Sequence, residues 1–251
     1  MIDLHCHLLP GIDDGPRDIA GSLALARAQV AAGVRTVAVT PHAIERFPND
    51  GQTIVRGLEE LSAALRDAEI PLALLRGAEV DLLHALEHAD DELAQLTLGD
   101  SSWLLLEAPT VSVAPLEAGV ERLQRRGFQL LLAHPERAPM LQREPAMLSR
   151  LVRRGVRTQL TAGGLNGQFG KTVQRFALRL VDAGLIHTFA SDAHDVSRRP
   201  PGLREPLQQA GLGEHAELLC GEHPAALLAG DGLPEHVPLR RRTSLLHRLR
   251  S

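Results

Sequence analysis

Aromatic residues are scarce in this chain. It has five Phe, one Trp and no Tyr, so aromatic side chains make up 2% of the 251 residues. A core built on large aromatic contacts is therefore excluded. Hydrophobic residues still amount to 44%, which is enough for a buried core, and we expect Leu, Val and Ala to fill it.

Cysteine is also rare. Only Cys6 and Cys220 occur, far apart and without Cys-X-X-Cys spacing. This pattern excludes a disulfide framework and a thiolate zinc site. We expect both thiols to be packed in the interior.

A long apolar run is missing as well. None approaches the length of a membrane span, and the first residues carry Asp3 and two histidines where a secretory signal would be apolar. We therefore expect a cytoplasmic protein.

The net charge of the chain is -4, and it includes five arginines after residue 239. Residues 1–239 therefore carry a net charge of -9, which disfavours nucleic acid as a partner.

The chain begins with two histidines at strand spacing. Side chains alternate along a strand, so His5 and His7 project from one face and could share a cation, while Cys6 points away. The turn at 10–16 then brings two adjacent carboxylates, Asp13 and Asp14, back toward the strand. His-X-His alone is weak evidence, because it is more often a buried strand with two hydrogen-bonded histidines beside a surface turn.

Apolar runs and amphipathic stretches alternate along the chain. Helical spacing is found at about 18–32, 53–68, 82–95 and 116–126, between strand-like runs that begin near residues 2, 34, 71, 103, 128, 156 and 186. This alternation is typical of βα units around a parallel sheet, and α/β barrels often reach this length as one unit. We predict an α/β fold with about seven strands, in a single domain over residues 1–251 that ends in a basic tail at about 240–251.

Residue types that bind metals stand at the carboxyl ends of six of these seven runs. In parallel barrels these ends gather at one face, where active sites lie. The residues are His5, His7, His42, Glu79, Glu107, His134, Asp192 and His194, joined by Asp13 or Asp14 from the first turn. Their shared position predicts a metal site. Imidazole and carboxylate ligands without thiolate suit manganese, iron or zinc.

The charge of such a site indicates a substrate class. Three divalent cations and four carboxylates leave a charge of about +2 among aliphatic side chains, which favours an anion such as a phosphomonoester. Arg137, three residues after His134, and Arg198 or Arg199, after the last strand, could bind the phosphate oxygens.

Together these motifs resemble a known superfamily. The stretches His5-Cys6-His7, Thr40-Pro41-His42, Glu79, Glu107, His134-Pro135-Glu136-Arg137 and Ser191-Asp192-Ala193-His194 are similar to those of the PHP (polymerase and histidinol phosphatase) superfamily. The opening residues 3–16, Ala162-Gly163, Phe169-Gly170-Lys171 and Arg199-Pro200 resemble, more narrowly, the bacterial metal-dependent tyrosine-protein phosphatases of the CpsB/YwqE type. The likeness extends from Met1 to about Pro201.

The resemblance implies a distorted seven-stranded (β/α) barrel of PHP type with three divalent metal ions, usually manganese. By motif position, the first metal would be bound by His5, His7, Glu79 and Asp192, the second by Glu79, Glu107 and His134, and the third by Asp14, His42 and His194. Arg137 and Arg199 would hold the phosphate. The implied substrate is phosphotyrosine on the tail of a bacterial kinase that controls capsular or extracellular polysaccharide synthesis.

Some positions depart from the family pattern. Ala43 stands where the family often repeats histidine, and Thr161 and Gly164 replace polar residues around the Ala-Gly turn, so the resemblance does not extend to the substrate contacts there. The Cys-X5-Arg motif of cysteine-dependent tyrosine phosphatases is absent, because Ile12 and Ala226 stand six residues after the two cysteines.

Three further features have less defined roles. His84 and His88 lie four residues apart without a carboxylate partner, and we expect them to face solvent. Gly163-Gly164 with Asn166-Gly167 forms either an anion cradle or a plain turn. The tail at 240–251 either contacts a partner or an anionic membrane, or is a frayed terminus.

The residues leave three functions open. A metal-dependent tyrosine phosphatase is the leading hypothesis. The alternatives are a small-molecule phosphoesterase, such as a histidinol-phosphate phosphatase, and a non-catalytic adaptor that binds a kinase. The sequence does not determine the oligomeric state.

Overall fold

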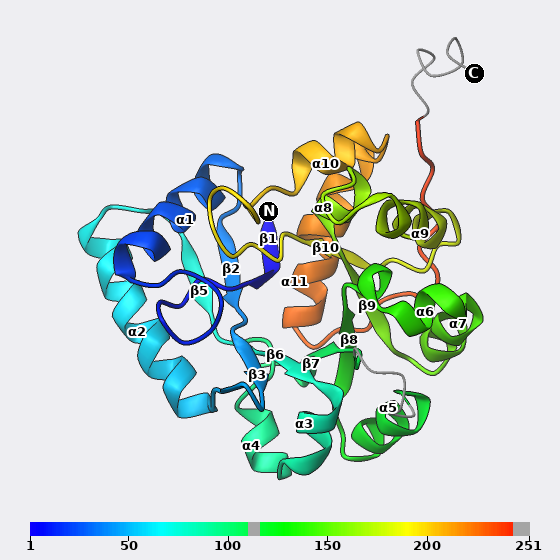
Figure 1. Cartoon of the computed structure of the whole chain (residues 1–251), viewed down its shortest axis with the longest axis horizontal. Coiled ribbons are helices and arrows are strands. Elements are labelled where there is room, and N and C mark those ends of the chain that lie inside the picture. The colour runs from blue at the N-terminus through cyan, green and yellow to red at the C-terminus, as the bar shows by residue number, and fades with distance from the viewer. Residues whose placement is uncertain (110–115, 243–251) are drawn as a thin grey trace.

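The computed structural model describes residues 1–109 and 116–242, in which strands and helices alternate (Figure 1). The strands are β1 (Ile2–Cys6), β2 (Thr36–Val39), β3 (His42–Ile44), β4 (Phe47–Pro48), β5 (Ala73–Leu75), β6 (Glu79–Asp81), β7 (Trp103–Glu107), β8 (Gln129–Ala133), β9 (Arg157–Thr161) and β10 (Thr188–Ala190). The helices are α1 (Ile19–Ala31), α2 (Gly51–Asp67), α3 (Leu82–Glu87), α4 (Asp90–Ala94), α5 (Leu116–Arg125), α6 (Pro139–Arg143), α7 (Pro145–Arg153), α8 (Ala162–Leu165), α9 (Lys171–Asp182), α10 (Arg204–Gln209) and α11 (His223–Leu228).

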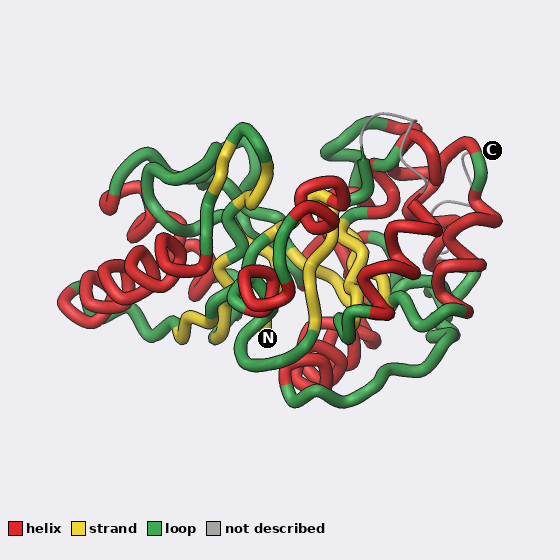
Figure 2. Tube along the Cα trace, turned by 90° about the horizontal axis from the view of Figure 1, so that it is seen from below, coloured by secondary structure: helices red, strands yellow, loops and turns green. Residues whose placement is uncertain are grey.

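The strands form two sheets with helices around them (Figure 2). One has the order β1-β2-β5, and the other has the order β10-β9-β8-β7-β6-β3-β4. Every pairing is parallel except the short hairpin of β3 and β4. The expectation of an α/β fold with a parallel sheet is therefore confirmed.

The two sheets approach each other between β1 and β10. An isolated bridge joins Cys6 to Ala193, and the backbone N–H of Asp192 donates to the carbonyl of His5 at 2.9 Å. No continuous ladder joins these strands in the described residues, so the seven-stranded barrel expected above is not confirmed.

Two of the expected strands are interrupted, and each interruption has a local cause. The run 71–80 divides into β5 and β6, which belong to different sheets. At the break lies Gly77, where a Cβ atom would come within 2.9 Å of Leu98 and 3.2 Å of Thr40. The run after residue 34 breaks at Pro41, which has no backbone N–H for the ladder. Beyond it, the expected loop contains β3 and β4.

The helix expected at 82–95 also divides in two. His88 ends α3 with an extended backbone, and the Glu92 side chain accepts a hydrogen bond from the backbone N–H of Ala89 before α4. Elsewhere the side chains of Asp18 and Asp50 accept backbone N–H groups at the starts of α1 and α2. The two helices begin within two residues of their expected starts.

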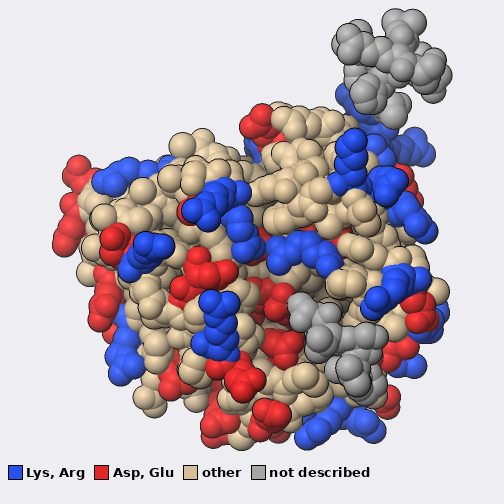
Figure 3. Space-filling model, viewed as in Figure 1, with Lys and Arg blue, Asp and Glu red and all other residues tan. Residues whose placement is uncertain are grey.

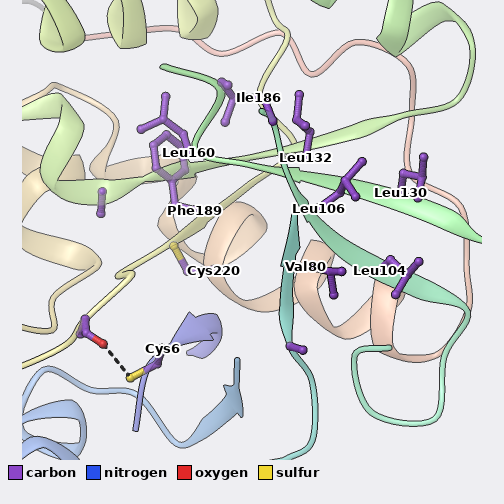
Figure 4. Close-up of a cluster of buried hydrophobic side chains, with 14 of the residues drawn as sticks. Cys6, Val80, Leu104, Leu106, Leu130, Leu132, Leu160, Ile186, Phe189 and Cys220 are labelled. Carbon is purple, nitrogen blue, oxygen red and sulfur yellow. Dashed lines mark hydrogen bonds between the residues drawn. The ribbon is translucent and has the colours of Figure 1, made fainter. Parts of the chain in front are cut away.

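Aliphatic side chains are buried on both faces of the larger sheet, as the composition predicted. Leu104, Leu106, Leu130 and Leu132 belong to the large core cluster drawn in Figure 4. The alternate residues Leu105 and Leu131 lie in a second cluster with Trp103 and with Leu227 of α11. A parallel sheet covered on both faces explains the continuous apolar runs.

The two cysteines are free and buried, as expected. The Cys6 thiol donates to the carbonyl of Ala193 at 3.6 Å (Figure 4). Burial raises the pKa of the Cys6 thiol well above its ordinary value and that of Cys220 to about 12. Neither sulfur is a reactive thiolate. Among the described helices, none combines the length and hydropathy that a bilayer span requires.

Candidate metal centre

The predicted metal-binding side chains lie together where the two sheets meet. His5 and His7 come from β1 and the residue after it, His42 and Glu79 begin β3 and β6, Glu107 ends β7, and His134, Asp192 and His194 follow β8 and β10. His42 is in register with Glu79. Acidic side chains gather in the middle of the face shown in Figure 3. His42 and Glu79 stand at strand starts rather than ends, because their runs are interrupted just before them.

Four donor atoms converge between β1, β6 and the loop after β10. Nε2 of His5 lies 3.2 Å from Nε2 of His7, 3.2 Å from Oε2 of Glu79 and 3.3 Å from Oδ1 of Asp192. Nε2 of His7 is 3.3 and 3.5 Å from the same two oxygens. Donors with these separations at the corners of a tetrahedron would lie roughly 2 Å from its centre, the usual distance from zinc to nitrogen or oxygen ligands.

Two buried atoms in the cluster lack a hydrogen-bond partner among the described residues. They are Oδ1 of Asp192 and Nδ1 of His42. The latter lies 3.1 Å from Oε2 of Glu79 without the orientation of a hydrogen bond. Buried polar atoms are normally satisfied, so atoms that face one another without bonding are the pattern expected of ligands to a common cation.

The structure separates the roles of Asp13 and Asp14. Oδ1 of Asp14 lies 3.1 Å from Nε2 of His194 and 3.5 Å from Nε2 of His42, and these residues with His7 form a second group of possible ligands. Asp13 instead accepts from Nδ1 of His7 at 2.7 Å, which turns Nε2 of His7 toward the cluster. Asp14 is also the acid that the resemblance implied as a ligand, and that assignment stays a prediction.

A third group surrounds the other oxygen of Glu79. Nε2 of His134 lies 2.5 Å from Oε1 of Glu79 and 4.0 Å from Oε1 of Glu107. His42, Glu79 and Glu107 also offer donor atoms close enough to share an ion. Glu79 thus belongs to two of the three groups, which is the arrangement that a bridging ligand would require.

Two arginines border the cluster. The guanidinium groups of Arg137 and Arg199 both donate to Oδ2 of Asp192. Nη1 of Arg199 also lies 2.8 Å from Nε2 of His194, and the Arg137 guanidinium carbon lies 5.0 Å from the ring centroid of Phe169. Arg198, the alternative to Arg199, uses its backbone carbonyl to accept from Gln168 and its N–H to donate to Asp195, outside the cluster.

The ionisation states reflect crowded negative charge. Burial alone would raise the pKa of Glu79 and of Asp192, but neighbouring cationic side chains hold both well below their ordinary values. Burial disfavours charge on His7, but Asp13, Asp192 and Glu79 together raise its pKa well above the ordinary value. A divalent cation would replace that proton as the balancing charge.

Two other groups in the cluster are favoured in their neutral forms. Burial, and then the charge of Glu79, raise the pKa of Glu107 to about 8. Burial, and then Arg137, lower the pKa of His134 to about 4. Neutral imidazole is the form that binds a metal, and a bound cation would ionise Glu107.

The backbone is strained at two of these residues. His134 and Asp192 adopt left-handed conformations, with φ of 30° and 51°. Such conformations cost on the order of 1–3 kcal/mol each for residues other than glycine, and they cluster at functional sites. Here they turn each side chain from the end of its strand into the cluster.

Two supporting residues, Gln159 and Asp3, were not given a role from the sequence. Gln159 of β9 lies 3.1 Å from Nδ1 of His5 through its Oε1 atom. Asp3 accepts hydrogen bonds from Gln29 and Ser191, which ties β1 to the loop that carries Asp192. Asp3 had a detectable signal, because it stands two residues before His5 in the opening motif. No sequence signal indicated a role for Gln159, because its partner His5 is 154 residues away in the chain.

The remaining sequence features are mostly structural. Gly163 and Gly164 lie in α8 and are buried, and Asn166 and Gly167 lie in the turn that follows it. A Cβ atom on Gly164 would lie 3.3 Å from Oε1 of Glu136. Arg241 and Arg242, at the start of the basic tail, pair with Asp182 and Glu214. The rest of that tail, 243–251, lies outside the described residues.

The fold and this cluster define a class: an α/β protein with a candidate metal centre at one end of its parallel strands, bordered by arginines. The family model for capsular polysaccharide synthesis, CpsB/CapC, matches residues 1–216. The tyrosine-protein phosphatase YwqE of Bacillus subtilis is 39% identical over 231 residues, which cover 87% of this chain and 91% of YwqE. This chain belongs to the CpsB/CapC family.

Two further comparisons agree. The tyrosine-protein phosphatase CpsB of Streptococcus pneumoniae is 27% identical over 213 residues, covering 82% of this chain and 87% of CpsB. A crystal structure from work on YwqE and CpsB, described as unique metal-dependent tyrosine phosphatases, superposes with a TM-score of 0.84 at 34% identity. It covers 97% of this chain and 100% of that one.

Proposed function

We propose that this protein is a metal-dependent protein-tyrosine phosphatase. The observation that carries the proposal is the convergence of His5, His7, Glu79 and Asp192 on one point, with two guanidinium groups beside it. Its relatives are named for the same activity. The proposed protein substrate is a bacterial tyrosine kinase, or its C-terminal tail, that controls capsular or extracellular polysaccharide synthesis.

The metal content is part of the proposal. Three divalent ions, most readily manganese and alternatively iron or zinc, would occupy the three groups of donors, two of which share Glu79, with the ligand sets assigned above. Bound divalent ions would stabilise negative charge on phosphoryl oxygens and lower the pKa of water. The donor set of imidazoles and carboxylates without thiolate fits these ions.

The arginines have the geometry to bind a phosphate dianion. Arg137 and Arg199 both donate to one carboxylate oxygen of Asp192, so their N–H groups already face a common acceptor. Phosphate oxygens are equivalent acceptors for guanidinium groups. Both arginines would position the phosphorus beside the metal ligands and offset the charge that develops on its oxygens.

The orienting residues would keep the ligands fixed during the reaction. Asp13 holds His7, and Oε1 of Gln159 lies within hydrogen-bonding distance of His5. Such partners set the tautomer and ring orientation of metal-binding histidines.

The leaving group also favours a phosphotyrosine substrate. The phenolate of tyrosine, whose conjugate acid has a pKa of about 10, is a better leaving group than an aliphatic alkoxide.

The proposal treats residues 1–251 as one catalytic domain in the cytoplasm. The match to the family model supports a single domain, because residues 1–216 include both sheets and all the candidate metal ligands.

Hydrolysis of a phosphotyrosine peptide tests the proposed function. The metal-stripped protein should be inactive and should recover with manganese, and a protein indifferent to both treatments would refute the proposal. Faster hydrolysis of histidinol phosphate or nucleotides would identify a small-molecule phosphoesterase instead. A non-catalytic adaptor would release no phosphate from any substrate, with or without metal, yet would still bind the kinase.

A further inference from the structure

One face of α9 carries a stripe of positive charge. Lys171, Arg175 and Arg179 are spaced four residues apart and are exposed, so they lie on the same side of the helix. Like charges at this spacing destabilise a helix unless a partner neutralises them. No salt bridge reaches any of the three among the described residues, and Asp182, at the end of α9, pairs with Arg241. The stripe is therefore available to an external anion.

A groove lies beside this stripe. It has a volume of about 350 Å³ and is lined by Gln142 of α6 and by Thr172, Arg175, Phe176 and Arg179 of α9. We name it the α6–α9 groove. Figure 3 shows Lys and Arg side chains gathered over this part of the molecule, which lies on the right in Figure 1.

Residues at or next to both walls of the α6–α9 groove contact the segment that carries Arg137. On one side, the Gln142 side chain donates to the carbonyl of Glu136 at 2.7 Å, next to Arg137 in the chain. On the other, Phe169 precedes α9 by two residues, and its ring lies 5.0 Å from the Arg137 guanidinium carbon. A chain whose phosphate is held by Arg137 could therefore continue into this groove.

We propose that the α6–α9 groove binds acidic residues that flank the phosphotyrosine of a protein substrate. This inference rests on the proposed function. From Lys171 to Arg179 the helix rises about 12 Å, which matches roughly four residues of an extended peptide. Glutamate and aspartate side chains would pair with Arg175 and Arg179, and arginine forks bind carboxylates with two parallel hydrogen bonds.

The distribution of charge favours a peptide over a membrane or nucleic acid. Residues 1–239 carry a net charge of -9, and acidic side chains occupy the middle of the face in Figure 3. A bilayer or a duplex needs a broad positive surface, whereas this positive charge is confined to a stripe beside a groove. A short acidic segment fits both the length and the charge of the stripe.

The test compares two phosphotyrosine peptides, one with glutamates on both flanks and one with glutamines at the same positions. The manganese-loaded full chain should hydrolyse the acidic peptide with a kcat/KM on the order of tenfold higher at low salt, since each exposed pair contributes a few-fold at most. The difference should decrease at high ionic strength because salt screens exposed charges.

The decisive variant is the double substitution Arg175→Gln/Arg179→Gln. The acidic-to-neutral ratio of kcat/KM should fall to about two, and the ratio within each protein cancels any general effect on turnover. Arg175→Lys/Arg179→Lys should restore most of the preference, because it restores the charge. The control Arg27→Gln/Arg56→Gln removes two exposed charges from α1 and α2, on the other side of Figure 1, and should keep the tenfold ratio.

Each outcome separates the two proposals. A protein that hydrolyses neither peptide with metal refutes the proposed function itself. A protein that hydrolyses both equally, or a double variant that keeps the preference, refutes only the groove. A third outcome would favour a lipid surface over a peptide. In that case the unaltered protein would show no preference for the acidic peptide but would bind vesicles of phosphatidylglycerol, and Arg175→Gln/Arg179→Gln would abolish that binding.

Discussion

Two pairs of histidines in this protein have similar spacing and different surroundings. The ring centroids of His7 and His194 lie 3.8 Å apart in the candidate metal centre, and those of His84 and His88 lie 4.0 Å apart beside α3. His84 and His88 are half-buried and line a pocket of about 250 Å³, whereas the sequence predicted that both face solvent. Proximity of imidazoles is therefore common to both regions.

The carboxylates distinguish them. Asp13, Asp14, Glu79 and Asp192 lie around His7 and His194, whereas no group of possible ligands includes His84 or His88 in the part of the chain described. Glu92, which lines the same pocket, instead caps the backbone at Ala89. The carboxylates of the candidate metal centre come from segments far apart in the sequence, which the fold brings to one point.

The largest expected effect comes from removing a donor atom. Asp192→Ala should lower kcat/KM on a phosphotyrosine peptide by about a thousandfold or more, because metal stabilisation of the transition state is worth several kcal/mol. His84→Gln/His88→Gln should change it less than about twofold. Steady-state kinetics and elemental analysis of bound manganese check both variants. An equal loss of kcat/KM in the two variants would contradict the distinction between the two regions.

A smaller effect should follow from loosening one histidine. Asp13→Ala leaves the donor atoms in place but removes the hydrogen bond that orients His7. Loss of such partners typically costs 10- to 100-fold in metal affinity or activity. A manganese titration of activity should show a weaker apparent affinity. An unchanged titration would show that packing alone orients His7.

Metal binding should also stabilise the fold. At a manganese concentration 100 times its dissociation constant, the free energy of unfolding should rise by about 2.7 kcal/mol, which is roughly 5–10 °C in Tm for a chain of this size. Thermal melts with and without manganese measure this shift. The increase in Tm should remain in His84→Gln/His88→Gln and disappear in Asp192→Ala. An increase that remained in Asp192→Ala would show that manganese binds at another site.

His187 offers a third comparison, a buried histidine without carboxylate neighbours. Burial, and then Arg157, lower its pKa to about 3. The unfolded chain therefore binds a proton near pH 6.5 that the folded chain refuses, so stability is lost as the pH falls from about 6.5 toward 3. The limiting slope from one such group is about 1.4 kcal/mol per pH unit.

Urea unfolding at pH 7, 6 and 5 tests this effect. His187→Gln should be destabilised at pH 7, because Thr158 loses its hydrogen-bond partner, but its stability should fall by about 1 kcal/mol less per pH unit below pH 6. Parallel slopes in the two proteins would contradict the assigned pKa.

The smallest expected effect is on stability at the half-buried pair. His84→Gln should alter the free energy of unfolding by no more than about 0.5 kcal/mol, as is usual for partly exposed positions without a buried network. A loss of several kcal/mol would show that this pair is structural in a way that the metal centre is not.

The sequence alone was enough to predict alternating strands and helices, the buried aliphatic core and most of the residues that gather in the candidate metal centre. These features depend on local periodicity and on residue type, which a single chain displays directly. The division of the run at 71–80 could not be predicted in the same way, because it depends on the close approach of Leu98 and Thr40 to Gly77.

The tertiary structure decided what depends on distant segments meeting. It oriented Asp14 toward His194 and Asp13 toward His7, although the two acids are adjacent in the sequence. It also brought Arg137 and Arg199 to the same oxygen of Asp192, and it placed α9 beside the loop after β8. Spacing along a strand or helix determines which residues share a face, but only the packed backbone determines which faces converge.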